Sequence, residues 1–258
     1  MYDPKWLRGK TVAVTGANRG LGLELAKELS KLNCRVIGLC RGASSELSGL
    51  DGVEVVEKFD VTSIEAVEEC CSKLAGSYLN KVDCLINNAG YFYGPEESIA
   101  ADTINYEEEL KMIDICALGP LRATSSFHKF GLLKKHPQED PQEAAHQKSK
   151  VALITSQGGS ISWRDVQNPA GGDYGHHISK ASANMLGALM HKELTDYTIS
   201  ILHPGFCRTD MTRKYEKIWD IEGAVETSVG ARRVLHEINN DQVGGKFINC
   251  EDGLEIPW

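Results

Sequence analysis

The sequence predicts an α/β fold in which about seven strands form one doubly wound parallel sheet with helices on both faces. Two observations lead to this expectation. Short apolar runs rich in β-branched residues alternate with longer segments of helical periodicity along the whole chain. The first of these runs passes through a cluster of glycines directly into a helical segment. Such an alternation is typical of strands joined by crossover helices, which gives parallel pairing.

Length, charge and composition suit a single soluble domain. The 258 residues are enough for one α/β domain with a full core, and we expect one domain over residues 1–258. The formal net charge is −8 and no long basic run is present, so nucleic acid and anionic membranes are not expected partners. The first residues contain no apolar signal region, and no stretch of about 18 apolar residues follows. We therefore expect a cytoplasmic protein.

The eight cysteines show no C-x-x-C spacing, and most lie inside apolar runs. A free cysteine packs as a small hydrophobic residue in such runs. We therefore expect free thiols and no metal site, because a large cytosolic domain needs neither disulfides nor a structural metal.

The first strand is predicted over Lys10–Thr15 and leads into the glycine-rich sequence GANRGLG, which precedes the helical LELAKELSKL. A strand that turns through glycines into a helix presents backbone N–H groups and the positive end of a helix dipole to a phosphate. Gly16 and Gly20 allow the backbone to approach a pyrophosphate, because no Cβ is in the way. This arrangement predicts a Rossmann-type dinucleotide site.

The second strand, Cys34–Arg41, ends in an arginine where many dinucleotide-binding folds place an acidic residue for the ribose hydroxyls. Arg41 can pair with a 2′-phosphate instead, and Arg19 in the glycine loop can approach the same group. Two arginines at one corner of the site favour NADP(H). The alternative, that Arg41 only opens a solvated loop, stays open.

The next elements follow the same alternation. Val53–Val61 is predicted as the third strand, with Asp60 at its end, and Val82–Ile86 as the fourth. Between them, Thr62 and Glu65 form a capping box for a helix that continues through Leu74.

Residues 91–106 form an aromatic and acidic loop beyond the fourth strand, where substrates bind in this architecture. Asn105 and Glu108 are predicted to begin a long helix that continues to about Lys135. Residues 136–149 are polar, contain two prolines and have almost no large apolar residue, so we expect a surface insertion there.

The carboxyl-terminal third completes the sheet. The predicted elements are a strand over Val151–Ser156, a helix that carries Lys180 to about Leu194, a strand over Thr198–His203, a helix near 224–238 and a last strand over Gly245–Cys250.

Six motifs, in this order, resemble those of the short-chain dehydrogenase/reductase family over essentially the whole chain. They are TGANRGLG (15–22), the strand-end Asp60, NNAG (87–90), S-x-x-G-S (156–160), Lys180 and PGFCRTDM (204–211). The ending GKFINCEDGLEIPW is similar to the carbonyl-reductase branch of C-factor or Sniffer type.

The resemblance implies a carbonyl or alcohol substrate, a nicotinamide cofactor and a set of residues that bind it. The cofactor residues implied in this sequence are Gly16, Asn18, Arg19, Gly20, Leu21, Arg41, Asp60, Val61, Asn88, Ala89, Gly90, Lys180, Pro204, Gly205 and Thr209. It also implies a homodimer or homotetramer, in which the long helix and the Lys180 helix pair with their copies. Small residues on the latter, Ala181, Ala183, Gly187 and Ala188, either allow close helix approach on that face or pack on the sheet.

The catalytic residues depart twice from the family's Asn, Ser, Tyr and Lys. Ser156 and Lys180 are kept, but Cys116 stands in place of the Asn and His176 in place of the Tyr. His176 lies four residues before Lys180, so both occupy one helix face, whereas Tyr174 lies off that face.

An imidazole at this position changes the expected chemistry. Its unperturbed pKa is about 6.5, and the neighbouring ammonium of Lys180 lowers that pKa. A neutral His176 is a usable base and a poor acid near pH 7, so alcohol oxidation suffers less than carbonyl reduction. Three classes therefore stay open: an NADP-dependent oxidoreductase with a Ser-His-Lys site, a cofactor-binding protein with little catalysis, and a lyase or isomerase that uses the same pocket.

Overall fold

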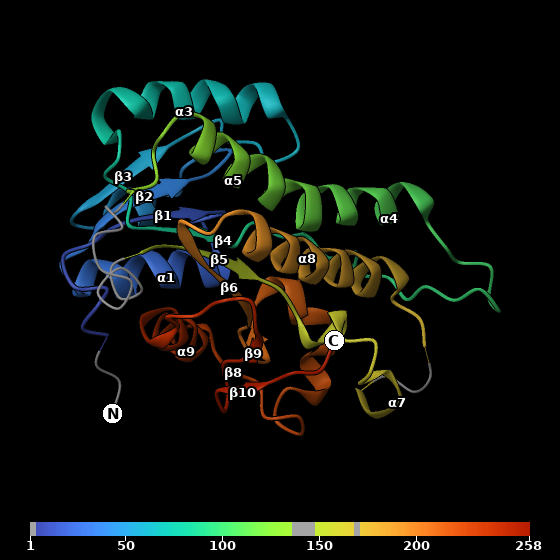
Figure 1. The fold of residues 1–258 in the computed structure, drawn as a ribbon. Coiled ribbons are helices and arrows are strands. Elements are labelled where there is room, and N and C mark those ends of the chain that lie inside the picture. The colour runs from blue at the N-terminus through green and yellow to red at the C-terminus, as the bar shows by residue number, and fades with distance from the viewer. Residues whose placement is uncertain (1–3, 136–147, 168–170) are drawn as a thin grey trace.

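The computed structural model describes residues 4–135, 148–167 and 171–258, and it confirms the doubly wound α/β fold (Figure 1). Eight strands form the main sheet in the order β10-β9-β6-β5-β4-β1-β2-β3. All neighbours pair in parallel except β10, which is antiparallel to β9 and was not predicted. Most of the predicted insertion, residues 136–147, lies outside the described residues. Its last residue, Ser149, already belongs to a strand.

Most strands are shorter than the apolar runs that predicted them, but the two that begin at Ser149 and Tyr197 start earlier than predicted. The main sheet consists of β1 (Thr11–Thr15), β2 (Arg35–Leu39), β3 (Val53–Val56), β4 (Cys84–Asn87), β5 (Ser149–Ile154), β6 (Tyr197–His203), β9 (Phe247–Asn249) and β10 (Leu254–Glu255). A two-stranded ribbon pairs β7 (Cys207–Arg208) with β8 (Val225–Glu226). The sheet order reverses between β1 and β4, and ligands bind at such a switch point in open α/β sheets.

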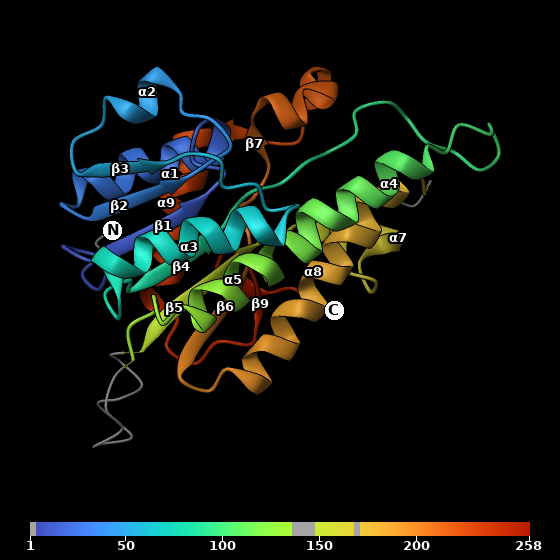
Figure 2. The same ribbon diagram turned by 90° about the horizontal axis from the view of Figure 1, so that it is seen from above.

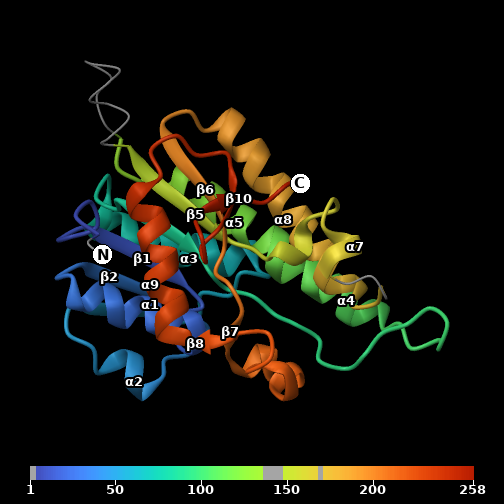
Figure 3. The same cartoon turned by 90° about the horizontal axis from the view of Figure 1, so that it is seen from below.

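Helices cover both faces of the sheet. One face carries α3 (Ile64–Tyr78), α4 (Tyr106–Ile113), α5 (Gly119–Lys129) and α8 (Tyr174–Glu193), as Figure 2 shows. The other carries α1 (Gly20–Lys31) and α9 (Thr227–Asn240), which lie side by side in Figure 3. Two short helices, α2 (Ser45–Ser48) and α7 (Arg164–Gln167), were not predicted. Within the described ranges, no helix is long and apolar enough to cross a bilayer.

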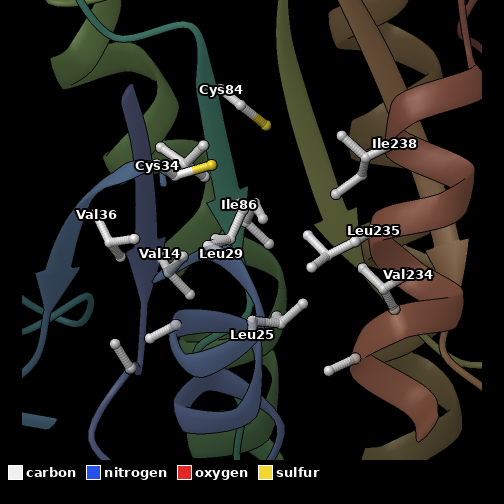
Figure 4. Packing of buried hydrophobic residues seen from close by; sticks show 14 of the residues in the cluster. Val14, Leu25, Leu29, Cys34, Val36, Cys84, Ile86, Val234, Leu235 and Ile238 are labelled. Carbon is white, nitrogen blue, oxygen red and sulfur yellow. The ribbon is translucent and has the colours of Figure 1, made fainter. Parts of the chain in front are cut away.

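The core beneath α1 and α9 shows why these segments fold as helices (Figure 4). Leu25 and Leu29 are four residues apart on α1 and are completely buried against the sheet. Val234 and Leu235 of α9 are equally buried beside them. Burial of each such side chain contributes about 1.5–3 kcal/mol, so this face of the sheet holds the two helices firmly.

The predicted capping box before α3 is wrong by one residue. Ser63 is the N-cap, and its hydroxyl accepts the backbone N–H of Ala66. Thr62 is not available for that role, because its N–H and its hydroxyl both donate to Asp60.

The long helix begins at the predicted cap but ends earlier than expected. Asn105 accepts the N–H of Glu108, as predicted. A π-helical turn over Asp114–Leu118 interrupts the helix, and α5 ends at Lys129 because Gly131 adopts a left-handed conformation with φ of 62°.

Candidate active site

The glycine loop after β1 is joined to the end of β4 by a small hydrogen-bond network. The Thr15 hydroxyl accepts the backbone N–H groups of Asn88 and Ala89, both at 3.0 Å. The Asn88 side chain donates back to the Thr15 carbonyl. Gly16 has φ of +66°, and a Cβ there would lie 2.9 Å from the Cα of Ala89. Only glycine fits this close approach, which sets the loop at the switch point of the sheet.

The start of α1 has the properties of a phosphate-binding helix terminus. Its first turn contains no acidic residue, and no side chain caps it, so the first N–H groups stay available. Gly20 has φ of +55° and nothing within 4 Å of its Cβ position, which leaves the backbone open on that side. Asn18, Arg19 and Leu21 flank Gly20 in the sequence. The predicted pyrophosphate residues therefore fit the phosphates of a dinucleotide.

Arg19 and Arg41 are both exposed, and within the described ranges neither side chain has an ion-pair partner. Asp60 lies close enough to Arg41 to feel its charge. Burial raises the pKa of the Asp60 carboxyl, but hydrogen bonds from Thr62 and then the charge of Arg41 outweigh burial and leave that pKa lowered. Val61 is buried and packs against Gly119.

Two of the predicted catalytic residues lie where β5 ends. The Lys180 ammonium is largely buried and donates to the carbonyl of Ile154 at 3.3 Å. The Ser156 hydroxyl accepts the N–H of Gly158 at 3.0 Å, which leaves its own hydrogen free to donate elsewhere.

His176 stands one turn before Lys180 on α8, as predicted. Its ring meets the ring of Phe92 edge-on, with centroids 4.9 Å apart. A Cβ on Gly158 would lie 3.0 Å from its Nε2 atom, so the absence of a side chain at Gly158 makes room for the imidazole. Burial, then the charge of Lys180 and of His177, lowers the pKa of His176 to about 3. The ring is therefore neutral at physiological pH, more completely than the sequence suggested.

Cys116 lies in the π-helical turn, and its thiol is turned toward the loop after β4. Its Sγ donates to the carbonyl of Tyr91 at 3.3 Å and accepts the Tyr91 N–H at 3.4 Å. Gly90 packs beside it. The side chain is buried. Cys116 therefore joins the long helix to the NNAG segment and is not directed at His176 by any described hydrogen bond.

The remaining predicted cofactor residues follow β6. Pro204 and Gly205 form the turn, and Gly205 has φ of +87°. Thr209 caps a 3₁₀ segment, residues 210–218, through reciprocal bonds with Thr212. We call residues 210–218 the strap.

Two buried carboxylate groupings beside His176 were missed from the sequence. Asp173 accepts hydrogen bonds from Lys214 and Tyr215 of the strap. Glu109 of α4 lies against Gly175, and burial and a shared hydrogen bond with the buried Glu97 raise the pKa of Glu109 to about 7. No local signal marks either grouping, because each joins segments far apart in the sequence.

Comparisons with known proteins identify the family of this chain. The family model described as "short chain dehydrogenase" matches residues 10–218, which is most of the chain. This chain belongs to the short-chain dehydrogenase/reductase family. The family uses NAD(P) to interconvert carbonyl compounds and alcohols, as the resemblance of the motifs implied.

Individual relatives match different shares of this short-chain dehydrogenase/reductase. The chain is 30% identical over 252 residues to 1-hydroxy-2-glutathionyl-2-methyl-3-butene dehydrogenase of a Rhodococcus strain, covering 96% of this chain and 99% of the relative. It is 31% identical over 182 residues to C-signal of Myxococcus xanthus, covering 69% and 93%. The carbonyl reductase Sniffer of Drosophila melanogaster has the same fold, with a TM-score of 0.76 over 96% and 99% of the chains at 21% identity.

Proposed function

We propose that this protein is an NADP(H)-dependent oxidoreductase that interconverts a carbonyl compound and an alcohol at Ser156, His176 and Lys180. The observation that carries the proposal is the convergence of these three residues at the end of β5. His176 and Lys180 share one face of α8, and Gly158 links His176 to Ser156. The glycine loop that fits a dinucleotide opens at the same edge of the sheet.

Each residue has a distinct role in this proposal. The bound nicotinamide supplies or accepts a hydride. The Ser156 hydroxyl, whose hydrogen is free, donates to the substrate oxygen. The Lys180 ammonium, held by the Ile154 carbonyl, stabilises negative charge that develops there. Neutral His176 accepts the proton of an alcohol, so oxidation is the direction that this site supports better near pH 7.

A second candidate function is an NADP-binding protein with little catalysis. The observation that favours it is the low pKa of His176, which leaves almost no imidazolium to protonate a carbonyl oxygen. Turnover separates the two. NADPH absorbance would be followed with a panel of aldehydes and ketones, and NADP⁺ reduction with the matching alcohols. No turnover in either direction, with intact NADPH binding, would favour the second function.

The preference for NADP(H) rests on Arg19 and Arg41, which are exposed and unpaired within the described ranges. We expect NADPH to bind at least about ten times more tightly than NADH, or about 1.4 kcal/mol. Arg41→Asp should narrow or reverse that ratio, whereas Lys192→Asp, which changes an exposed lysine of α8, should leave it unchanged. Equal affinities of the parent protein for the two cofactors by calorimetry would contradict the assignment.

We also propose that the protein forms a homodimer or homotetramer through α4, α5 and α8, which lie side by side in Figure 2. The exposed large apolar residues there are Tyr106, Leu110, Leu118, Leu121, Ile178, Met185 and Leu189. The small residues expected at this face behave differently. Ala183 is buried and Gly187 packs on Ile201, so both face the sheet.

Light scattering at micromolar concentration tests this assembly. Met185→Lys should weaken it, whereas Val243→Lys, at an exposed apolar residue elsewhere, should not. A monomeric parent protein would refute it.

A cytoplasmic location is also proposed, because all eight cysteines are free and buried. Cell fractionation tests that point.

A further inference from the structure

Asp173, directly before α8, is the anchor for the strap. The Lys214 Nζ atom lies 2.8 Å from Asp173 Oδ1, and the Tyr215 hydroxyl donates to Oδ2 at 2.6 Å. Both members of the ion pair are largely shielded, with 17% and 19% of their side chains exposed. Asp173 has φ of 47°, a left-handed conformation that is uncommon outside glycine. Both carboxylate oxygens of Asp173 therefore bind side chains of the strap, Oδ1 that of Lys214 and Oδ2 that of Tyr215.

Asp173 holds the middle of the strap, whereas Thr212 holds its start through bonds to Thr209 and Cys207. None of its residues is buried in the core. Besides Asp173, its described contacts at this point are aromatic. The Lys214 ammonium lies 4.5 Å from the centre of the Phe92 ring, and the Tyr215 ring stacks on Phe92 with centroids 6.2 Å apart. Phe92 in turn contacts His176. Asp173, the strap and Phe92 therefore form one connected wall beside the proposed reacting centre.

The positive charge of Lys214 is compensated within this wall. Lys214 would present a free ammonium close to His176, but Asp173 compensates it at 2.8 Å. Burial raises the pKa of the Asp173 carboxyl, and the hydrogen bonds from Lys214 and Tyr215 outweigh burial and keep it ionised. The exposed Glu96 adds a further negative charge near Tyr215. The surface left toward a substrate is thus aromatic, with no excess of positive charge.

We propose that this wall selects carbonyl compounds with an uncharged, flat apolar group, and that Asp173 sets the preference by neutralising Lys214. Asp173 is a positioning and specificity-determining residue here, since it acts through Lys214, Tyr215 and Phe92. The inference deepens the proposed function and rests on it for the location of the substrate. It goes further in stating which substrates are rejected: those with a carboxylate next to the wall.

The test compares two ligands of similar shape and different charge, methyl 4-formylbenzoate and 4-carboxybenzaldehyde. Their binding to the NADP⁺-loaded protein is measured by calorimetry, so that no hydride transfer is needed. The parent protein should bind the ester at least about ten times more tightly. Asp173→Asn keeps the side-chain shape but frees the Lys214 charge, and it should shift the ratio toward the carboxylate at least about tenfold. Asp173→Asn combined with Lys214→Met should restore the parent ratio.

The matched control is Asp210→Asn, in an exposed ion pair with Arg213 of the same strap, which should not change the ratio. If Asp173→Asn does not fold, Lys214→Met gives the second arm: it leaves Asp173 uncompensated and should widen the preference for the ester. Equal or tighter binding of the carboxylate by the parent would overturn the proposal. So would a shift in Asp173→Asn no larger than in Asp210→Asn, or a narrowed preference in Lys214→Met. Selective binding without turnover would refute only the proposed oxidoreductase activity.

Discussion

Replacement of His176 by tyrosine is the most informative change to the proposed active site. It places a phenol four residues before Lys180, on the same face of α8. The change leaves the glycine loop and the arginine corner untouched, so NADPH affinity should stay within about threefold.

The expected effect follows from the low pKa of His176. With a pKa of about 3, roughly one imidazole in 10⁴ carries a proton at pH 7, whereas a histidine with an ordinary pKa of 6.5 would be protonated in about one molecule in four. Burial and Lys180 therefore raise the free energy of protonating His176 by about 5 kcal/mol relative to an ordinary histidine. A positioned general acid is worth about 10²–10⁴ in rate. His176→Tyr should raise kcat/KM for carbonyl reduction at pH 7 by about 10²-fold or more.

The pH profile of the parent protein tests the same reasoning without a mutation. Because the acid form of His176 becomes scarcer as pH rises, carbonyl reduction should quicken about tenfold for each pH unit from 8 down to 5. Alcohol oxidation should not fall over this range, because the neutral base persists. His176→Ala should abolish turnover while NADPH still binds. Unchanged turnover in His176→Ala, or a flat reduction profile, would remove His176 from the mechanism. Activity that appears only in His176→Tyr would instead favour the non-catalytic function.

Three further predictions concern buried groups. Burial, and then the hydrogen bond shared with Glu97, raise the pKa of Glu109 to about 7, so its stabilising effect is complete below the ordinary carboxyl pKa and is lost as pH rises through 7; Glu109→Gln should flatten that decline in urea unfolding measured from pH 5 to 8. Lys150 donates to three carbonyls where α9 ends, and Lys150→Met should lower the free energy of unfolding by about 3 kcal/mol, whereas Lys148→Met should have little effect. Gly158→Ala would place a Cβ 3.0 Å from His176, so it should reduce turnover more than it reduces thermal stability.

The fold could be predicted because its signals are local. The turn at Gly16 and the cap at Asn105 each depend on residues close by in the sequence, and both occur in the structure as predicted. Errors arose where a local signal met a competitor. Thr62 has the right side chain for a cap, but it donates its hydrogen bonds to Asp60, so Ser63 caps α3 instead. The strand β10 consists of two residues, both exposed, so no apolar run in the sequence indicates it.

The chemistry of His176 is set by contacts that no local pattern contains. Its distance from Lys180 follows from helical spacing and was predicted, and so was the direction in which its pKa moves. The size of that shift depends first on burial, and burial comes from Phe92 in one loop and from Gly158 after β5. Phe92 is itself held by Lys214, more than 30 residues beyond His176 in the chain. Asp173 affects both the pKa of His176 and the charge of the wall, because its carboxylate raises that pKa and compensates the Lys214 ammonium, whose charge lowers it. Asp173→Asn should therefore lower the pKa of His176 further and shift substrate selection toward carboxylates at the same time, and a variant that altered one property without the other would show that they have separate origins.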